Sequence, residues 1–338
     1  MLNVKKWRDV QMKCWKGIVM IILSLALLFP NAMQTEAAKV DVLKGDNHAG
    51  NSFAVKSGSI YYVNNGYLQD KPNGIYKVGR DMKTFRLIKK GEFTNIHMYL
   101  NSIVTFNEEE NILQRFSPDG KMIREYPQVA SSNFLIEKDL IYYHTGNNMY
   151  QLGINGRGNK HLLTTKGYIQ EYTVHNGWLY FVTSISRSND PYDMDQTNSL
   201  SKIKIAGSKK VISLVSNAYN IDSIIVRDGY IYSVIHRTSN IDGRPLYRMN
   251  YSGKNVKRVT DLRIISPFIG KKYMYSVENS HDDRQKFFRA TVDGKNMKTV
   301  GVLPGRMVNA EYHDGEFLFE VQNIKQQQFL LHRIHQQY

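Results

Sequence analysis

An apolar, aromatic segment recurs seven times along the chain, and this repeat constrains the fold more than any other feature. The copies start about 43 residues apart, as in Ile60-Tyr61-Tyr62, Ile141-Tyr142-Tyr143 and Leu179-Tyr180-Phe181; the others begin at Ile103, Ile231, Met274 and Leu318. Each copy is about five residues long and rich in aromatic and β-branched residues, which predicts a buried β-strand. A fixed period of this length is typical of repeat architectures.

Tight-turn signals precede several of these segments. Ser57-Gly58, Asn176-Gly177, Asp228-Gly229 and Asp314-Gly315 stand just before a copy. Asn-Gly and Asp-Gly favour two-residue hairpins because both residues tolerate positive φ. The stretch before each turn is therefore predicted to be strand a, which pairs with strand b, the recurring segment itself.

A second hairpin follows each copy after a loop of variable length. Alternating stretches interrupted by Pro-Asp-Gly, Ser-Gly or Asp-Gly turns predict strands c and d, and they begin at Gly74, Ile112, Met149, Leu200, Leu246 and Phe287. Four short strands in each repeat of about 43 residues are typical of a β-propeller blade. The sequence therefore predicts an all-β, seven-bladed propeller.

The ends of the chain bear on how the ring closes. The seventh repeat reaches strand c at Phe329–His332 and shows no strand d, whereas residues 39–43 provide a spare strand. We expect this N-terminal strand to pair into the last blade, because a ring closed in this way leaves no free edge at the seam. Six blades is the alternative, because the second repeat, around Ile103, is the weakest.

One segment resembles a known repeat family. Phe287-Phe288-Arg289-Ala290, followed by Asp293-Gly294 and Asn296, is similar to the c–d segment of YWTD repeats in low-density-lipoprotein-receptor propellers. The chain as a whole looks like secreted bacterial YWTD-like repeat proteins grouped as a domain of unknown function. The Asp that follows the aromatic pair in YWTD repeats is replaced here, for example by Val63. The resemblance therefore implies the fold and carries over no polar network between blades.

The first 38 residues have the pattern of a targeting segment. Basic residues precede an unbroken apolar run from Gly17 to Pro30, and small residues follow near Ala37 and Ala38. This order predicts a secretory signal peptide. Fourteen residues reach only ~21 Å, short of the ~30 Å hydrocarbon core of a membrane. An uncleaved signal-anchor is the alternative, and residues 39–338 are expected to form the single propeller domain.

Cysteine and histidine content narrows the chemistry. The one cysteine, Cys14, lies in the targeting segment, so thiol catalysis, disulfides and cysteine-based metal sites are excluded for the mature chain. None of the ten histidines has the helical spacing of a zinc hydrolase, and no Gly-x-Ser-x-Gly elbow is present. We expect no cofactor, no metal and no catalytic residue, although a propeller enzyme could assemble a site from separate loops.

Two faces of the predicted propeller differ in charge. The c–d turns and their first strand residues carry twelve Lys or Arg against three Asp. We define the basic face by a representative set of five: Lys209, Lys210, Lys254, Lys257 and Arg258. The b–c loops at the other end of the blades carry more acids than bases. Solvation of tight turns is the simplest explanation for the basic residues, and attraction to an anionic envelope surface is the functional one.

The longest b–c loops hold the candidate ligand-binding residues. Oxygen-rich side chains cluster there and could contact a ligand or calcium, although the spacing does not fit an EF-hand. The candidates are Asp190, Asp193, Asp195, His236, Asp242, Arg244, His281 and Asp282.

Together these features predict an exported, non-catalytic, monomeric propeller that binds a protein or glycan partner at the cell envelope or outside the cell. A net charge of +15 invites a nucleic-acid interpretation, but the targeting segment argues against nucleic acid. The alternative function is an exported carbohydrate-active hydrolase or lyase. Two carboxylates converging at the channel mouth, ~5–10 Å apart, would favour that alternative.

Overall fold

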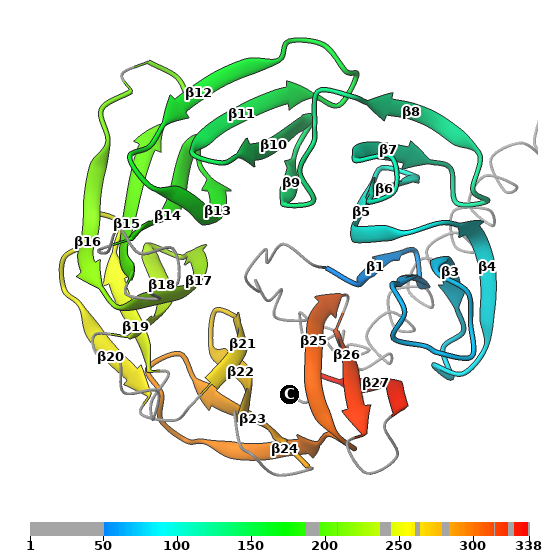
Figure 1. Ribbon diagram of the computed structural model, residues 1–338. Helices are drawn as coiled ribbons and strands as arrows, with labels where there is room; N and C mark the ends of the chain where they lie inside the picture. Colours follow the sequence, from blue (N-terminus) through cyan, green and yellow to red (C-terminus); the bar gives the residue numbers. More distant parts are fainter. Residues whose placement is uncertain are drawn as a thin grey trace, which may run out of the picture. The chain divides into compact units, whose positions relative to one another are not determined.

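A computed structural model describes residues 51–186, 196–207, 209–236, 245–260, 264–278, 284–313, 315–323 and 328–336. All of them belong to one compact unit, Asp41–Tyr338. Within these residues the secondary structure is entirely β, with 27 strands in seven antiparallel sheets. The sheets follow one another around a ring in chain order (Figure 1), so the described chain is a seven-bladed β-propeller.

Each blade pairs its strands in chain order, with the first strand innermost (Figure 1). The first three blades are β1 (Phe53–Lys56), β2 (Ser59–Asn64), β3 (Gly74–Val78) and β4 (Phe85–Lys90); β5 (Phe93–Tyr99), β6 (Ser102–Asn107), β7 (Ile112–Phe116) and β8 (Met122–Tyr126); β9 (Phe134–Glu137), β10 (Leu140–Thr145), β11 (Asn148–Gly153) and β12 (Lys160–Thr164). The next two are β13 (Tyr168–His175), β14 (Trp178–Ser186), β15 (Gln196–Lys204) and β16 (Ile212–Ala218); β17 (Asn220–Arg227), β18 (Tyr230–His236), β19 (Leu246–Asn250) and β20 (Lys257–Thr260). The last two are β21 (Ile264–Ile269), β22 (Tyr273–Glu278), β23 (Lys286–Thr291) and β24 (Lys298–Val302); β25 (Arg306–His313), β26 (Glu316–Asn323) and β27 (Gln328–His335).

The predicted repeat is confirmed. Every recurring segment forms the second strand of a blade, and the c–d hairpins lie where their turn signals predicted them. The six-bladed alternative is wrong, because residues 93–126 build a full four-stranded sheet of their own. The last blade contains three described strands, and the expected closing strand, residues 39–43, lies outside the described residues.

Type I′ geometry explains the tight a–b turns. Ser57 and Gly58 have φ of 49° and 72°, and Asn176 and Gly177 have 49° and 75°. Positive φ at both central residues matches the right-handed twist of the flanking strands, which is why Asn-Gly signals are read as hairpins. Because the strands of each blade pair antiparallel in chain order, the a–b and c–d turns share one end of the blades. The b–c and d–a connections share the other end.

The hydrophobic core lies between neighbouring blades. One cluster joins Phe287 of β23 and Tyr275 of β22 to Phe317 and Phe319 of the next blade. Strand-b tyrosines such as Tyr62 and Tyr275 are fully buried, as the sequence predicted. Aromatic side chains bury a large area each, so the strand-b aromatics contribute strongly to the packing between blades, together with aliphatic residues.

The ring closes through contacts between its last and first blades. Leu318 of β26 belongs to the same buried cluster as Phe53, Ile60 and Tyr62 of the first blade. The backbone N–H of Phe53 also donates to a carboxylate oxygen of Glu311 at 3.0 Å. This interface, the seam, therefore has an apolar part and a polar part among the described residues.

Two glycines of the c–d turns lie where neighbouring blades approach closely. A Cβ on Gly120 would lie 2.4 Å from the carbonyl oxygen of Ile88, and one on Gly294 would lie 1.7 Å from that of Val259. Both glycines have positive φ, 89° and 84°. Each of these glycines thus allows the positive φ of its own turn. Its missing side chain also allows the turn to pack closely against strand d of the preceding blade.

Candidate functional site

Polar side chains gather where the innermost strands begin, at the b–c and d–a end of the blades. The strand registers define two equivalent positions in each blade, immediately before the residue equivalent to Phe53. These positions hold Asn51, Ser52, Thr94, Asn95, Ser132, Asn133, Gln170, Glu171, Asp222, Ser223, Ile265, Ser266, Val308 and Asn309. Twelve of the fourteen are polar, two are acidic and none is basic. We call this set the inner polar ring.

β-Bulges set the direction of these side chains. The pairing of strands a and b shifts register in five blades, for example between Thr94 and Ile96 and between Asp222 and Ile224. Three residues at the shifts, Asn95, Ser223 and Ser266, have φ of 52°, 62° and 47°. A bulge inserts one extra residue and re-aims the side chain, and such features recur next to functional sites.

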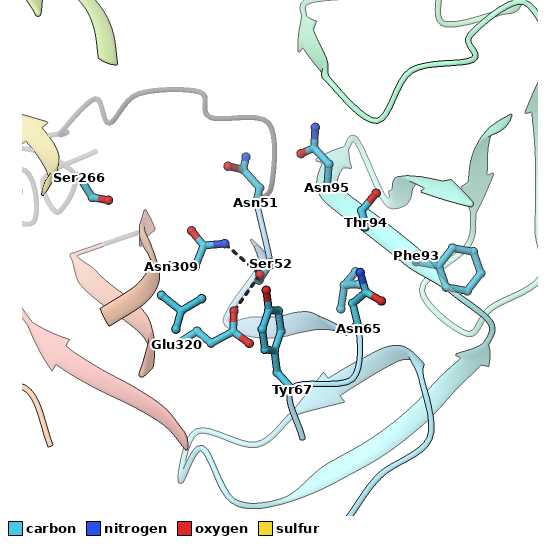
Figure 2. Close-up of a pocket in the computed structure, with 12 residues that line it drawn as sticks. Asn51, Ser52, Asn65, Tyr67, Phe93, Thr94, Asn95, Ser266, Asn309 and Glu320 are labelled. Carbon is cyan, nitrogen blue, oxygen red and sulfur yellow. Dashed lines mark hydrogen bonds between the residues drawn. The ribbon is translucent and has the colours of Figure 1, made fainter. Parts of the chain in front are cut away.

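A cavity of about 340 Å³ opens within this ring. Figure 2 shows its lining, which comes from the first, second and seventh blades and from Ser266 of the sixth. The polar lining side chains are Asn51, Ser52, Asn65, Tyr67, Thr94, Asn95, Ser266, Asn309 and Glu320. Val63, Phe93 and Val308 complete the lining, so the cavity is mostly polar and uncharged.

A chain of hydrogen bonds runs along the floor of the cavity across the seam (Figure 2). The amide of Asn309 donates to Oγ of Ser52 at 2.9 Å, and that hydroxyl donates to Oε2 of Glu320 at 3.1 Å. The other oxygen of Glu320 accepts from the Tyr62 hydroxyl at 2.6 Å. Both carboxylate oxygens of this buried side chain are therefore engaged within the protein.

Burial controls the ionisation of these groups. It raises the pKa of Glu320 to about 7, although the Tyr62 and Ser52 hydrogen bonds oppose the shift. Burial also raises the pKa of the nearby Glu311, whose second oxygen lies 2.9 Å from Nε2 of His313. Glu320 thus carries a proton through the acidic range and loses it near neutrality.

Asn95 is the most unusual residue of the lining. Its side chain is 2 % exposed, and its amide nitrogen donates to the carbonyls of Ser132 at 2.8 Å and Phe134 at 3.2 Å. These two acceptors fix the orientation of the amide. Its buried Oδ1 has no hydrogen-bond partner among the described residues. Buried acceptors in native proteins are nearly always satisfied, so this oxygen is an exception within the lining.

The sequence-predicted ligand residues lie mostly outside the described part of the chain. Asp190, Asp193, Asp195, Asp242, Arg244, His281 and Asp282 are all in this group. His236 is described and is 8 % exposed at the end of β18. Its Nε2 lies 3.4 Å from Oδ2 of Asp222 in the inner polar ring. The grouping of these loop residues into one site stays a prediction.

The basic face is exposed at the opposite end of the blades. All five of its residues, and the seven other basic residues of the c–d turns, are exposed. Lys209 donates to the carbonyl of Ile205 at 2.7 Å, and Lys254 presents its backbone N–H to Asn250. The three turn acids bond back to their own turns; Asp81 accepts from Lys83 and Thr84, which lowers its pKa to about 2.

The seam residues that line the cavity were not among the ligand-binding residues predicted from the sequence. Glu320 occupies a strand-b position where other blades have Val63, Val182 or Val277, as the registers show. The available signal was an acid in a position of the repeat that is apolar in five of the other six blades and is His144 in the third blade. Among the described residues there is no group of three or more potential metal-binding side chains, and no helix that could cross a membrane.

Comparison with known proteins supports the fold alone. No protein-family model matches the sequence, and no curated protein is similar to it. The tricorn protease aligns over 87 % of this chain with a TM-score of 0.63 and 5 % sequence identity. Puromycin hydrolase aligns over 86 % with a TM-score of 0.60 and 7 % identity. This chain spans 34 % and 54 % of those proteins, so it is similar to part of each.

Proposed function

We propose that this chain is an exported, non-catalytic β-propeller that acts as a binding scaffold at the cell envelope. The observation that carries the proposal is the difference between its two ends. Twelve exposed basic residues surround the c–d turns, whereas the inner polar ring at the other end contains no basic residue. A surface of one sign attracts anionic partners, and juxtamembrane basic residues contribute about 1 kcal/mol each near an anionic lipid surface.

The targeting segment and the cavity complete the proposal. Residues 1–38 supply the export signal, and the YWTD-like resemblance of Phe287–Val300 fits secreted repeat proteins. The basic face would hold the propeller against anionic envelope polymers or lipids. The inner polar ring would then face away from that surface, where its cavity can receive a partner.

Neutralising the basic face is expected to weaken envelope binding at least tenfold. The variant changes Lys209, Lys210, Lys254, Lys257 and Arg258 to glutamine, which removes five charges from two adjacent blades. Co-sedimentation of the purified chain with native envelope fragments, repeated at low and high salt, measures the effect. Screening by salt should weaken the wild type more than the variant.

A charge-matched control decides whether position or net charge matters. Five exposed basic residues at the other end of the blades are changed to glutamine in the control: Lys89, Lys90, Lys166, Arg284 and Arg306. The proposal expects near wild-type envelope retention for this control. Equal losses in both variants, or none in either, would reject the basic face as a binding surface.

The second candidate function is the carbohydrate-active hydrolase or lyase. Glu320 favours it, because a carboxyl group that titrates near neutrality beside a cavity suits a general acid. Glycoside hydrolysis requires a second carboxylate with a free oxygen. The four oxygens of Glu311 and Glu320 already contact Phe53, His313, Tyr62 and Ser52.

Activity assays separate the two functions. With neutral and acidic oligosaccharides, we expect the wild type to release no more reducing ends or unsaturated products than Glu320→Gln. Both proteins should give the background rate, since neither carboxyl group is available to a substrate. Turnover by the wild type that disappears in Glu320→Gln would favour the enzyme over the scaffold.

A further inference from the structure

We infer that the cavity of the inner polar ring binds a neutral carbohydrate chain, and this inference rests on the proposed binding function. The proposed function gives this cavity a partner of unspecified chemistry, and the inference specifies the class of ligand. Four features of the lining support it: its charge, the chemistry of its polar groups, one unsatisfied acceptor and one aromatic side chain.

The lining selects against charged ligands. No Lys or Arg lines the cavity, so an anionic ligand finds no counter-charge there. Its one acidic side chain, Glu320, accepts hydrogen bonds from Tyr62 and Ser52 at both oxygens. A cationic ligand would have to displace these buried bonds. Neutral ligands remain.

The polar groups of the lining both donate and accept hydrogen bonds. Asn51 and Asn65 supply amides and Ser266 supplies a hydroxyl, whereas Ser52 is bonded to Asn309 and Glu320 and Thr94 donates to Glu108. A sugar hydroxyl also donates and accepts, so each can pair with such groups in either direction. The volume of about 340 Å³ lies at the lower end of the ~300–1,000 Å³ range of small-molecule sites. It suits the end of a glycan better than a folded partner.

Asn95 provides the independent sign that a ligand is missing. Figure 2 shows its side-chain oxygen directed toward Asn51, within the cavity lining. The residue is held at a φ of 52° in the bulge of β5, and its amide is fixed by the two carbonyls of the neighbouring blade. Strained, over-determined residues of this kind cluster at ligand sites. A ligand O–H or N–H would satisfy the buried Oδ1.

Tyr67 supplies an aromatic surface at the side of the cavity. Its ring packs against Phe329 with centroids 4.8 Å apart, and it remains partly exposed in the b–c loop of the first blade. Figure 2 shows its hydroxyl directed toward Ser52. An amphipathic aromatic with one apolar face and one polar tip matches a sugar ring, which has both kinds of surface.

Calorimetric titration of the full chain with cellotriose and with chitotriose tests the inference. These probes are neutral sugars without and with amide N–H groups, and N-acetyltriglycine amide serves as a neutral peptide probe. We expect at least one sugar to bind with a dissociation constant in the millimolar range or below, and Tyr67→Ala to weaken it at least tenfold. Asn95→Ser should weaken it similarly, provided that its circular dichroism spectrum matches the wild type.

Tyr230→Ala is the matched control, because Tyr230 is a 38 % exposed tyrosine at the opposite end of its blade. It should bind the sugar like the wild type. No sugar binding at about 20 mM, well above a millimolar dissociation constant, would overturn the inference. So would binding of N-acetyltriglycine amide alone, or an equal loss in Tyr230→Ala. Envelope co-sedimentation of Tyr67→Ala should be unchanged, so a failure here is distinguishable from failure of the basic-face proposal.

Discussion

Replacing Gly294 with alanine is expected to destabilise the protein by about 2–5 kcal/mol. A Cβ at this position would lie 1.7 Å from the carbonyl oxygen of Val259, a distance that forces the c–d turn away from β20 of the neighbouring blade. Overpacking of this kind costs roughly 1–3 kcal/mol. The φ of 84° adds a further ~1–2 kcal/mol for a residue with a side chain. Thermal unfolding followed by circular dichroism should show Tm lowered by roughly 5–15 °C.

Gly229→Ala separates crowding from backbone strain. Gly229 has a nearly identical φ of 87°, but a Cβ there would meet nothing within 4 Å. It should lose only the strain component, about 1–2 kcal/mol. If Gly294→Ala and Gly229→Ala lower Tm by the same amount, the close approach between blades contributes nothing to stability.

These glycines illustrate what sequence patterns can and cannot predict. Asp293-Gly294 was recognisable as a hairpin turn, because positive φ is a local property of the backbone. The approach of Val259 to that turn depends on how one blade packs on the next. The seven blades and the strand order were predictable for the same local reason, since periodicity and turn residues act within each repeat.

The cavity was not predictable to the same degree. Its floor joins Tyr62 and Glu320, which are 258 residues apart, and Ser52 and Glu320, which are 268 apart. Only closure of the ring brings these groups together. The long loops were predicted to bind a ligand because their acids cluster in the sequence. Asn95 and Asn309 show no such pattern, since only the bulges and the packing of the folded chain distinguish them. Aligning the blades position by position would have shown Glu320 as the one acid in a position that is apolar in most blades.

Replacing Glu320 with glutamine is expected to stabilise the protein above neutral pH. Burial raises the pKa of this carboxyl from its ordinary value of 4.5 to about 7. An acid whose folded-state pKa is raised contributes stability that is fully present below pH 4.5 and is lost as the pH rises through 7. At pH 8 the wild type therefore holds a desolvated carboxylate, at a cost of about 3 kcal/mol. Glutamine stays neutral and can still accept from Tyr62.

His97 gives the stability of the wild type the opposite pH dependence. Burial, with a smaller contribution from His313, lowers its pKa from 6.5 to about 4. Its stabilising contribution is therefore present above pH 6.5 and is lost as the pH falls through 4. Between pH 4.5 and 6.5 the contributions of these two groups to stability offset each other. Glu320→Gln removes one of them, so its stability relative to the wild type should rise with pH over this range.

Urea unfolding of the wild type and Glu320→Gln at pH 5, 6.5 and 8 measures the expected divergence. Glu278→Gln is the control, because Glu278 is partly exposed in the sixth blade, where it lies 3.8 Å from Lys286 of the same blade. It should follow the wild type within about 0.5 kcal/mol, as surface substitutions do. A Glu320→Gln protein that is less stable than the wild type at pH 8 would contradict the expectation. The hydrogen bonds from Ser52 and Tyr62 would then outweigh burial, and the seam would depend on the charged form of this carboxylate.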